Sequence, residues 1–167
     1  MSKTQDNLKA AFAGESQANR KYLAFAKVAE REGKINLAKL FRAVAEGETI
    51  HALKHLQTLG EIKDSVENLK SAIAGETYEI ETMYPEFISS AKEEGEKAAE
   101  ISFTGANEVE KIHQKQFIEA LAQVESGKDI EDAKYFICQV CGQIELAEAP
   151  ENCPVCKSPA SSFTPME

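Results

Sequence analysis

Two Glu-x-x-His motifs, Glu48–His51 and Glu110–His113, lie 62 residues apart in a chain whose residue pattern is helical. Residues three positions apart on a helix share a face, so each motif points one carboxylate and one imidazole at the same place. Two such motifs, with one further Glu from each of two other helices, form the ligand set of bundle-core sites that hold two iron or two manganese ions. Glu15 and Glu76 are the candidates for the two single carboxylates.

An internal repeat indicates that these four segments belong together. Residues 11–16, Ala-Phe-Ala-Gly-Glu-Ser, match residues 72–77, Ala-Ile-Ala-Gly-Glu-Thr, at an offset of 61. Further along the offset becomes 62 and aligns Tyr22 with Tyr84, Phe25 with Phe87, Phe41 with Phe103, Glu48 with Glu110, and His51 with His113. Roughly the first 125 residues are therefore two copies of a helix pair. A pseudo-two-fold axis would place the two carboxylate sets face to face.

The two copies differ at one point that bears on the site. Glu79 lies three residues after Glu76 on the same helix face, and its counterpart in the first copy is Ala18. One residue is also inserted before Tyr84, because the offset changes there. A single-residue insertion in a helix is usually absorbed as a π-bulge, often at a functional site. We therefore predict a π-bulge or local distortion between Glu76 and Tyr84.

The spacing of apolar residues predicts four long helices with short connections, which favours antiparallel neighbours. The expected helices are Thr4–Arg31, Asn36–Leu59, Ser65–Glu94 and Glu96–Glu125. Ser65 offers a weak capping signal for the third helix. Pro85 falls inside that helix, and the missing proline amide agrees with a distortion there.

The composition excludes some classes of partner. The 167-residue chain has 28 acidic and 19 basic residues and a net charge of −9, which argues against nucleic acid because phosphate binding needs clustered Lys and Arg. Apolar runs approaching the roughly 20 residues of a membrane span are absent from the sequence. The polar segment 1–6 lacks the apolar core of a signal peptide. We therefore expect a cytoplasmic protein that binds neither membrane nor nucleic acid.

All four cysteines fall in the last 30 residues, as the pairs Cys138-x-x-Cys141 and Cys153-x-x-Cys156. Two such pairs predict a tetrahedral four-sulfur metal site, in which zinc would be structural and iron would relay single electrons. The spacing leaves both metals open. We expect residues 1–127 to form the helical domain, 128–133 a polar linker, and 134–167 a small domain with a strand at residues 135–137. About 34 residues need a bound metal in order to fold alone.

Other polar residues have simpler interpretations. His51 and His55 have a zinc-like spacing, but the repeat aligns His55 with Phe117, which favours a surface residue or a neighbour of the site. Tyr22 and Tyr84 are either core aromatics or hydroxyl donors to ligand carboxylates. Burying four or five carboxylates requires cations. Oxygen ligands with only two imidazoles favour iron or manganese over zinc or copper.

Taken together, these motifs resemble the rubrerythrins over essentially the whole chain. The residues that carry the resemblance are Ala13-Gly14-Glu15-Ser16, Glu48-x-x-His51, Gly75-Glu76-Thr77-Tyr78-Glu79 with Met83-Tyr84-Pro85, Glu110-x-x-His113, Cys138-x-x-Cys141-Gly142 and Cys153-Pro154-x-Cys156. The resemblance implies a mainly α fold, with a ferritin-like four-helix bundle followed by a small C-terminal rubredoxin-like four-cysteine domain.

The same resemblance implies a non-haem peroxidase that reduces hydrogen peroxide to water in oxidative-stress defence. Two iron ions with oxo and carboxylate bridges would be held by Glu15, Glu48, His51, Glu76, Glu79, Glu110 and His113. Glu79 and His51 match the positions that exchange as ligands of one iron with redox state. Tyr22 and Tyr84 would give hydrogen bonds to bridging carboxylates. Cys138, Cys141, Cys153 and Cys156 would hold one iron, or zinc, and the iron would deliver the electrons.

The implied partners are hydrogen peroxide, an electron donor such as rubredoxin or its reductase, and a second copy of the chain. In the homodimer that we expect, one chain's rubredoxin-like domain faces its partner's di-iron site, and helices can be exchanged. One departure from the family pattern is Lys157, where a Gly usually follows the last cysteine. If that position needs a positive φ, Lys adds strain of about 1 kcal/mol.

Two alternatives use the same residues. A ferritin-like protein would oxidise ferrous iron with dioxygen for storage, which needs no four-cysteine relay. A structural protein would combine an inert helical module with a zinc ribbon. Metal content and the preferred oxidant distinguish the three.

Overall fold

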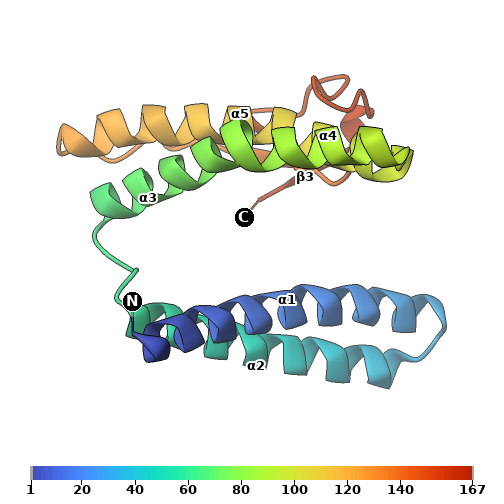
Figure 1. Cartoon of the computed structure of the whole chain (residues 1–167). Helices are drawn as coiled ribbons and strands as arrows, with labels where there is room; N and C mark the ends of the chain where they lie inside the picture. Colours follow the sequence, from blue (N-terminus) through green and yellow to red (C-terminus); the bar gives the residue numbers. More distant parts are fainter. Residues whose placement is uncertain (1, 167) are drawn as a thin grey trace. The chain divides into compact units, whose positions relative to one another are not determined.

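The computed structural model describes residues 2–166, which are mainly helical with a small C-terminal sheet (Figure 1). The helical elements are α1 (Lys3–Arg31), α2 (Ile35–Leu59), α3 (Ser65–Tyr78), the π-helical turn η1 (Glu79–Met83), α4 (Tyr84–Glu94), α5 (Lys97–Glu125) and the 3₁₀ turn η2 (Ala160–Ser162). The strands are β1 (Tyr135–Cys138), β2 (Ile144–Leu146) and β3 (Phe163–Pro165). The predicted mainly α class is confirmed. Within residues 2–166, every helix is too short or too polar to cross a membrane.

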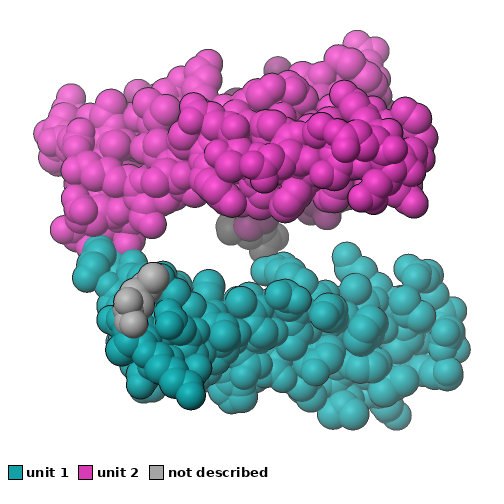
Figure 2. Space-filling view, in the orientation of Figure 1, with its two compact units in different colours: residues 1–63 teal, residues 64–167 magenta. Residues whose placement is uncertain are grey.

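The chain forms two compact units, residues 1–63 and residues 64–167 (Figure 2). Unit 1 is the helix pair α1–α2. Unit 2 contains α3, η1, α4 and α5 together with the C-terminal sheet. The third predicted helix is thus α3, η1 and α4 in succession. Each unit contains one copy of the internal repeat.

Side-chain caps set the beginnings of two helices. Ser2 Oγ accepts a hydrogen bond from the Gln5 amide at 3.3 Å, and Gln5 Oε1 accepts one from the Ser2 amide at 3.1 Å, which completes a capping box for α1. Asp64 caps α3, since its Oδ1 accepts from the Glu67 amide at 3.0 Å. The weak capping signal assigned to Ser65 was therefore one residue late, and the carboxylate of Asp64 is the cap.

The predicted π-bulge is confirmed by the turn η1. The Tyr84 amide donates to the carbonyl of Glu79, five residues earlier, in place of the usual four. Pro85 follows directly, in the first turn of α4. The wider turn absorbs the inserted residue, because one extra residue enters the loop that this hydrogen bond closes.

Each unit also contains a cluster of three aromatic rings. The clusters are Tyr22–Phe25–Phe41 in unit 1 and Tyr84–Phe87–Phe103 in unit 2. The closest ring centroids are 5.7 Å apart for Phe25 and Phe41 and 5.4 Å apart for Phe87 and Phe103. The repeat of the sequence is therefore also a repeat of packing, which places corresponding helices alike in the two units.

The C-terminal sheet is antiparallel, with strand order β2-β1-β3. The expected strand at residues 135–137 is β1, which extends to Cys138. Cys138 and Cys153 are fully buried and pack with Phe163. This core is small, and the cysteines themselves form most of it, so a metal between them would supply stability that apolar burial alone does not provide.

Candidate metal centres

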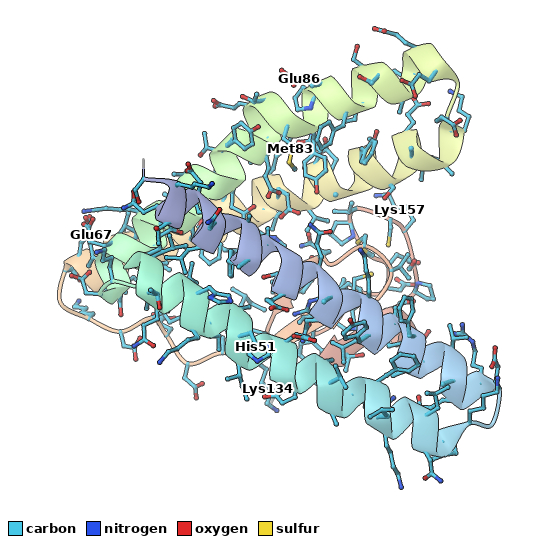
Figure 3. The ribbon with its side chains drawn as sticks, turned by 60° about the horizontal axis from the view of Figure 1, so that its bottom comes forward. His51, Glu67, Met83, Glu86, Lys134 and Lys157 are labelled. Carbon is cyan, nitrogen blue, oxygen red and sulfur yellow. The ribbon has the colours of Figure 1, made fainter. Side chains whose placement is uncertain are left out.

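The first group of possible metal ligands lies in unit 1, between α1 and α2. Glu15, Glu48 and His51 bring one ligand atom each within 4.8 Å of one another. His51 Nδ1 lies 3.1 Å from Glu48 Oε2 and 3.8 Å from Glu15 Oε1. His51 is exposed on α2 in this unit (Figure 3), with 60% of its side chain accessible. The three residues form an open half-site that offers oxygen and nitrogen donors on one face.

A polar contact fixes the register of the two helices beside this half-site. Asn19, one turn after Glu15, donates from Nδ2 to the Ala45 carbonyl and to Thr49 Oγ1, at 2.8 Å each. Thr49 directly follows Glu48 in the chain. The contact therefore fixes α1 and α2 in the register that brings Glu15, Glu48 and His51 together.

The second group lies in unit 2, between α3 and α5. Glu76, Glu110 and His113 also bring their ligand atoms within 4.8 Å of one another. His113 Nδ1 lies 2.7 Å from Glu110 Oε2. Gln114 Nε2 donates to Thr77 Oγ1 at 2.7 Å and so joins the two helices beside the ligands. The second half-site thus has the same donor set and the same kind of polar lock as the first.

Negative charge accumulates in the second half-site. Burial, the neighbouring Glu110 charge and a shared hydrogen bond with Glu110 raise the pKa of Glu76 to about 7. Burial and the Glu110 charge also raise the pKa of Glu79, and burial followed by the Glu79 charge raises the pKa of Tyr84. Without a cation, a proton must relieve this repulsion. The donor set therefore fits a bound cation that prefers oxygen and nitrogen ligands.

The remaining residues singled out in the sequence take different places. Glu79 lies outside the compact three-residue group, yet it experiences the charges of Glu110 and His113. Tyr22 and Tyr84 both pack in their clusters of aromatic rings, and burial and the neighbouring carboxylate charges also raise the pKa of Tyr84. His55 belongs to none of the ligand groups found among residues 2–166.

The four cysteines form the third group. All four sulfur atoms lie within 4.8 Å of one another, with 3.6 Å between the sulfurs of Cys138 and Cys156 and 3.6 Å between those of Cys141 and Cys153. Within the described chain each cysteine is a free thiol. A tetrahedral site with metal–sulfur bonds of about 2.3 Å has edges of about 3.8 Å. The sulfur positions therefore match a tetrahedral metal.

The sulfurs differ in their surroundings. Burial raises the pKa of Cys141 to about 12, while the hydrogen bond with the Ser158 hydroxyl, 3.2 Å away, lowers the pKa of Cys156 to about 6. Ionising all four thiols together requires a metal ion, because thiolates this close repel one another. Ser158 was not singled out from the sequence. Its position two residues after the last cysteine was the available signal.

Two family models together span most of the chain. Residues 6–121 match rubrerythrin, and residues 136–164 match the rubredoxin-like domain of rubrerythrin. The chain belongs to the rubrerythrin family. The ferritin-like fold with a C-terminal rubredoxin-like domain, predicted from the motifs, is thereby confirmed.

Named relatives extend the comparison with the family. Rubrerythrin-2 of Clostridium acetobutylicum is 40% identical, over 92% of this chain and 91% of that protein. Nigerythrin of Nitratidesulfovibrio vulgaris is 37% identical, over 96% of this chain and 85% of its own length. The solved structure of mixed-valence nigerythrin aligns with 99% of this chain and 88% of its own, at 36% identity and a TM-score of 0.58. The carboxylate–histidine and four-cysteine groups fit this family.

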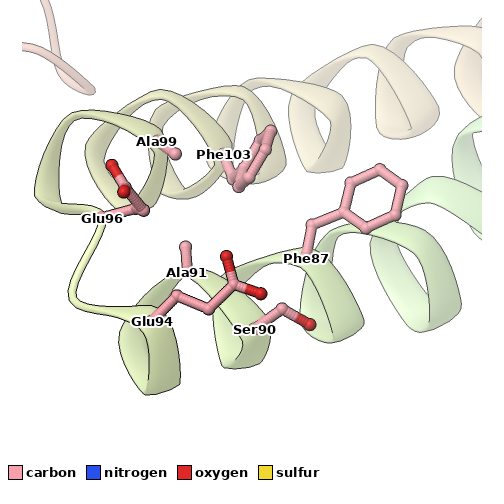
Figure 4. Close-up of a pocket in the computed structure, with 7 residues that line it drawn as sticks. All are labelled: Phe87, Ser90, Ala91, Glu94, Glu96, Ala99 and Phe103. Atoms are coloured by element: carbon pink, nitrogen blue, oxygen red, sulfur yellow. The ribbon is translucent and has the colours of Figure 1, made fainter.

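A shallow pocket of about 320 Å³ near the turn between α4 and α5 is not part of these centres. Phe87, Ala91, Ala99 and Phe103 line it together with Ser90, Glu94 and Glu96 (Figure 4). The lining contains none of the grouped ligand residues. In this rubrerythrin-family chain the candidate centres are therefore the two half-sites and the four cysteines.

Proposed function

We propose that the chain is a non-haem di-iron peroxidase that reduces hydrogen peroxide to water with electrons relayed through an iron in the four-cysteine site. The observation that supports this proposal most directly is the presence, in one chain, of two matching carboxylate–histidine half-sites and a four-sulfur site. Iron storage needs no four-sulfur relay, and a structural protein needs no half-sites. A role in oxidative-stress defence follows from this chemistry.

Seven residues are proposed to hold the two iron ions: Glu15, Glu48, His51, Glu76, Glu79, Glu110 and His113. Cys138, Cys141, Cys153 and Cys156 are proposed to hold the third. Iron bound in the half-sites would supply electrons to peroxide, and converting one peroxide into two waters consumes two electrons and two protons. Tyr84, whose pKa is raised by burial, stays protonated at neutral pH and can donate a hydrogen bond beside Glu79.

Each half-site offers only half of a di-iron ligand set, so an α1–α2 pair must meet an α3–α5 pair. Only residues 60–64 separate α2 from α3. We propose that the chain acts as a homodimer, in which the complementary pair comes from the same chain or, by helix exchange, from the second copy. A monomer that turns over peroxide, established by light scattering on the active sample, would contradict this proposal.

The electron donor is proposed to be rubredoxin, its reductase or a similar one-electron protein, and the location to be the cytoplasm. The family resemblance supports both. Purification of the chain with its bound metals, followed by metal analysis, would show whether iron or zinc occupies each site.

The decisive experiment is an absorbance trace of the ferric thiolate colour. The protein is reduced without oxygen, a small amount of hydrogen peroxide is added, and the colour is followed. Rapid return of the colour supports the peroxidase. Colour that returns with dioxygen and not with peroxide favours iron oxidation for storage. Absence of colour before and after addition indicates zinc in the four-cysteine site and contradicts the relay.

A further inference from the structure

The two cysteine knuckles carry different side chains at one equivalent position. Gln143 lies two residues after Cys141, and Ser158 lies two residues after Cys156. In each knuckle the backbone amide at this position donates a hydrogen bond to the sulfur of that cysteine. The knuckles therefore agree in their backbone at this point and differ in the side chain that it carries.

The two side chains make different contacts. Gln143 is buried, with 2% of its surface accessible, and its Nε2 donates to the Ile144 carbonyl at 2.9 Å and to Glu145 Oε1 at 3.1 Å. Ser158 instead places its Oγ 3.2 Å from the sulfur of Cys156. Cys156 thus has a polar side-chain neighbour in addition to the Ser158 amide.

Metal binding decides which atom of this contact donates the hydrogen. A free thiol can donate to the Ser158 oxygen, but a cysteine sulfur that holds a metal is a thiolate and has no proton. The Ser158 hydroxyl must then be the donor. Its acceptor is charged, which makes the hydrogen bond stronger than one between neutral groups. In the metal-bound module the contact is therefore a hydroxyl donor directed at Cys156.

Three backbone features hold Ser158 in this position. The amide of Cys153 donates to the Ser158 carbonyl at 2.7 Å, and the Lys157 amide donates to the Cys153 carbonyl at 3.0 Å. Pro159 follows, and a residue before proline is restricted to an extended backbone. Because the backbone has little freedom, rotation about χ1 alone directs the hydroxyl at the sulfur. The donor is therefore in place before a metal binds.

A further donor to a ligand sulfur changes the equilibrium between the two oxidation states of bound iron. Four thiolates with a ferric ion carry one net negative charge, and one added electron makes it two, while no bond forms or breaks. A hydrogen bond to sulfur stabilises the more negative form more strongly, so such bonds help to set the reduction potential. The half-sites consist of carboxylates and imidazoles, so this effect concerns the four-cysteine group.

We propose that Ser158 is a positioning residue of the electron relay, whose hydroxyl donates to Cys156 and raises the reduction potential of the iron held by the four cysteines. The inference rests on the proposed function for the iron itself and adds the side chain that adjusts its potential. A higher potential makes the module a better acceptor of an electron from the donor protein and a weaker reductant of the half-sites.

An anaerobic dye titration of the iron-loaded full chain tests this role. The protein is equilibrated with a one-electron dye of known potential, and the ferric thiolate band reports the oxidation state of the four-cysteine iron. Ser158→Ala is expected to keep the band and to shift the equilibrium about tenfold toward the ferric form, which is about 59 mV for one electron. Ser158→Thr keeps a hydroxyl, and Ser161→Ala removes an exposed hydroxyl from η2, so both are expected to stay close to the wild type.

Equal potentials for Ser158→Ala and the wild type would overturn the role of Ser158 and leave the relay intact. A tenfold shift in Ser161→Ala or in Ser158→Thr would overturn it too, because the shift would then not follow the hydroxyl beside Cys156. If Ser158→Ala does not take up iron, a crystal structure of the metal-loaded wild type decides. Ser158 Oγ within hydrogen-bond distance of the Cys156 sulfur supports the role, and a longer distance contradicts it.

The titration uses no peroxide, so its outcome is distinguishable from that of the proposed function. An iron-loaded wild type without the ferric thiolate band would contradict the relay and the role of Ser158 together. A potential that shifts in Ser158→Ala, in a protein whose colour does not return with peroxide, would support the role of Ser158 while the peroxidase function fails.

Discussion

Gly142 and Lys157 occupy equivalent positions in the two cysteine knuckles, and both have a positive φ, 86° and 63° respectively. Each follows the first cysteine of its pair by four residues. Each amide donates to the carbonyl of that cysteine, at 2.9 Å to Cys138 and 3.0 Å to Cys153. The fold therefore demands a left-handed backbone at both positions. Gly adopts this conformation without steric cost because it has no Cβ atom. Lys157, labelled on its loop in Figure 3, has a Cβ atom and is strained there.

Replacing Lys157 by Gly is expected to stabilise the four-cysteine module by about 1 kcal/mol, because the left-handed conformation penalises a residue with a Cβ atom. The Lys157 ammonium also donates to the Pro154 carbonyl at 2.7 Å, an exposed contact whose loss costs less than the strain. The loss of ferric thiolate absorbance with increasing guanidinium concentration measures the change.

The matched control for this substitution is Gly142→Ala, which places a Cβ at the equivalent position. It is expected to lower the guanidinium concentration at the unfolding midpoint by a similar amount, because the φ of 86° at this position disfavours Ala. If Lys157→Gly leaves the midpoint unchanged or lowers it, the ammonium contact outweighs the backbone strain.

The raised pKa of Glu76 predicts how the stability of the metal-free protein depends on pH. Burial above all raises its pKa to about 7 from the ordinary value of about 4.5, so between these values the unfolded chain has released a proton that the folded chain retains. Stability therefore falls as the pH rises from about 4.5 to about 7 and becomes flat above. Since the group is only partly buried, solvent screening reduces the effect to on the order of 1–2 kcal/mol.

Thermal unfolding of the chelator-treated protein, followed by circular dichroism at pH 5 and pH 8, measures this slope. The Glu76→Gln variant is expected to lose most of the difference between the two pH values. A wild type that is more stable at pH 8 than at pH 5 would show that carboxylate repulsion at Glu76 does not control the metal-free state.

The π-helical turn η1 sets the direction, around the helix axis, in which the side chains of α4 point. Deleting Ile80 would let η1 close as an ordinary α-helix and rotate Tyr84 and Phe87 by about 100° relative to Glu76, because an α-helix has about 3.6 residues per turn. The rotation would separate Phe87 from Phe103 and Tyr84 from the carboxylates. We expect fewer iron ions per chain and a lower unfolding temperature.

Metal analysis and calorimetry measure both effects of the deletion, and Ile80→Ala is its control because it trims the same side chain without changing the register. Equal iron content in the deletion variant and in this control would show that the inserted residue has no part in forming the second half-site.

The sequence predicted the features that depend on spacing within one segment or between repeats. The half-site residues, the position of the π-turn and the four-sulfur group all belong to this class. The Asp64 cap was missed because Ser65 beside it has a competing signal. The interhelical hydrogen bonds of Asn19 and Gln114 were also not predicted, because the two residues do not align in the repeat. Asn19 lies on α1 of unit 1, whereas Gln114 lies on α5 of unit 2.

The hydrogen bond that Gln116 on α5 donates to the Ile144 carbonyl could not have been predicted from spacing either. Gln116 has no special motif, and the segment 126–134 between α5 and β1 permits many placements of a small module. Tertiary packing selects one of them, and only the structure shows that this placement puts β2 against α5. The division into two units could not be predicted from the sequence either. An apolar helix face shows that another helix must cover it, but it does not specify whether that helix belongs to the same chain or to a second copy.

Cys141→Ser tests the relay that the whole proposal requires. Cys141 Sγ lies 3.6 Å from Cys153 Sγ and accepts the Gln143 amide, so a Ser oxygen at this position would replace a soft sulfur ligand by a harder, shorter one. Turnover with a rubredoxin-type donor is expected to be lost. A single oxidation of the pre-reduced half-sites by peroxide should remain, because their ligands are untouched.

Stopped-flow absorbance distinguishes donor-dependent turnover from the single oxidation of the half-sites in one preparation. Gln139→Ser is the control for local disturbance, because it changes the same knuckle and leaves all four sulfurs in place. Full steady-state turnover of Cys141→Ser with the same donor would show that electrons reach the half-sites by another route. A variant that also loses the single oxidation would instead mean that the four-sulfur group supports the fold of unit 2, since the half-site on α3 and α5 shares that unit with the module.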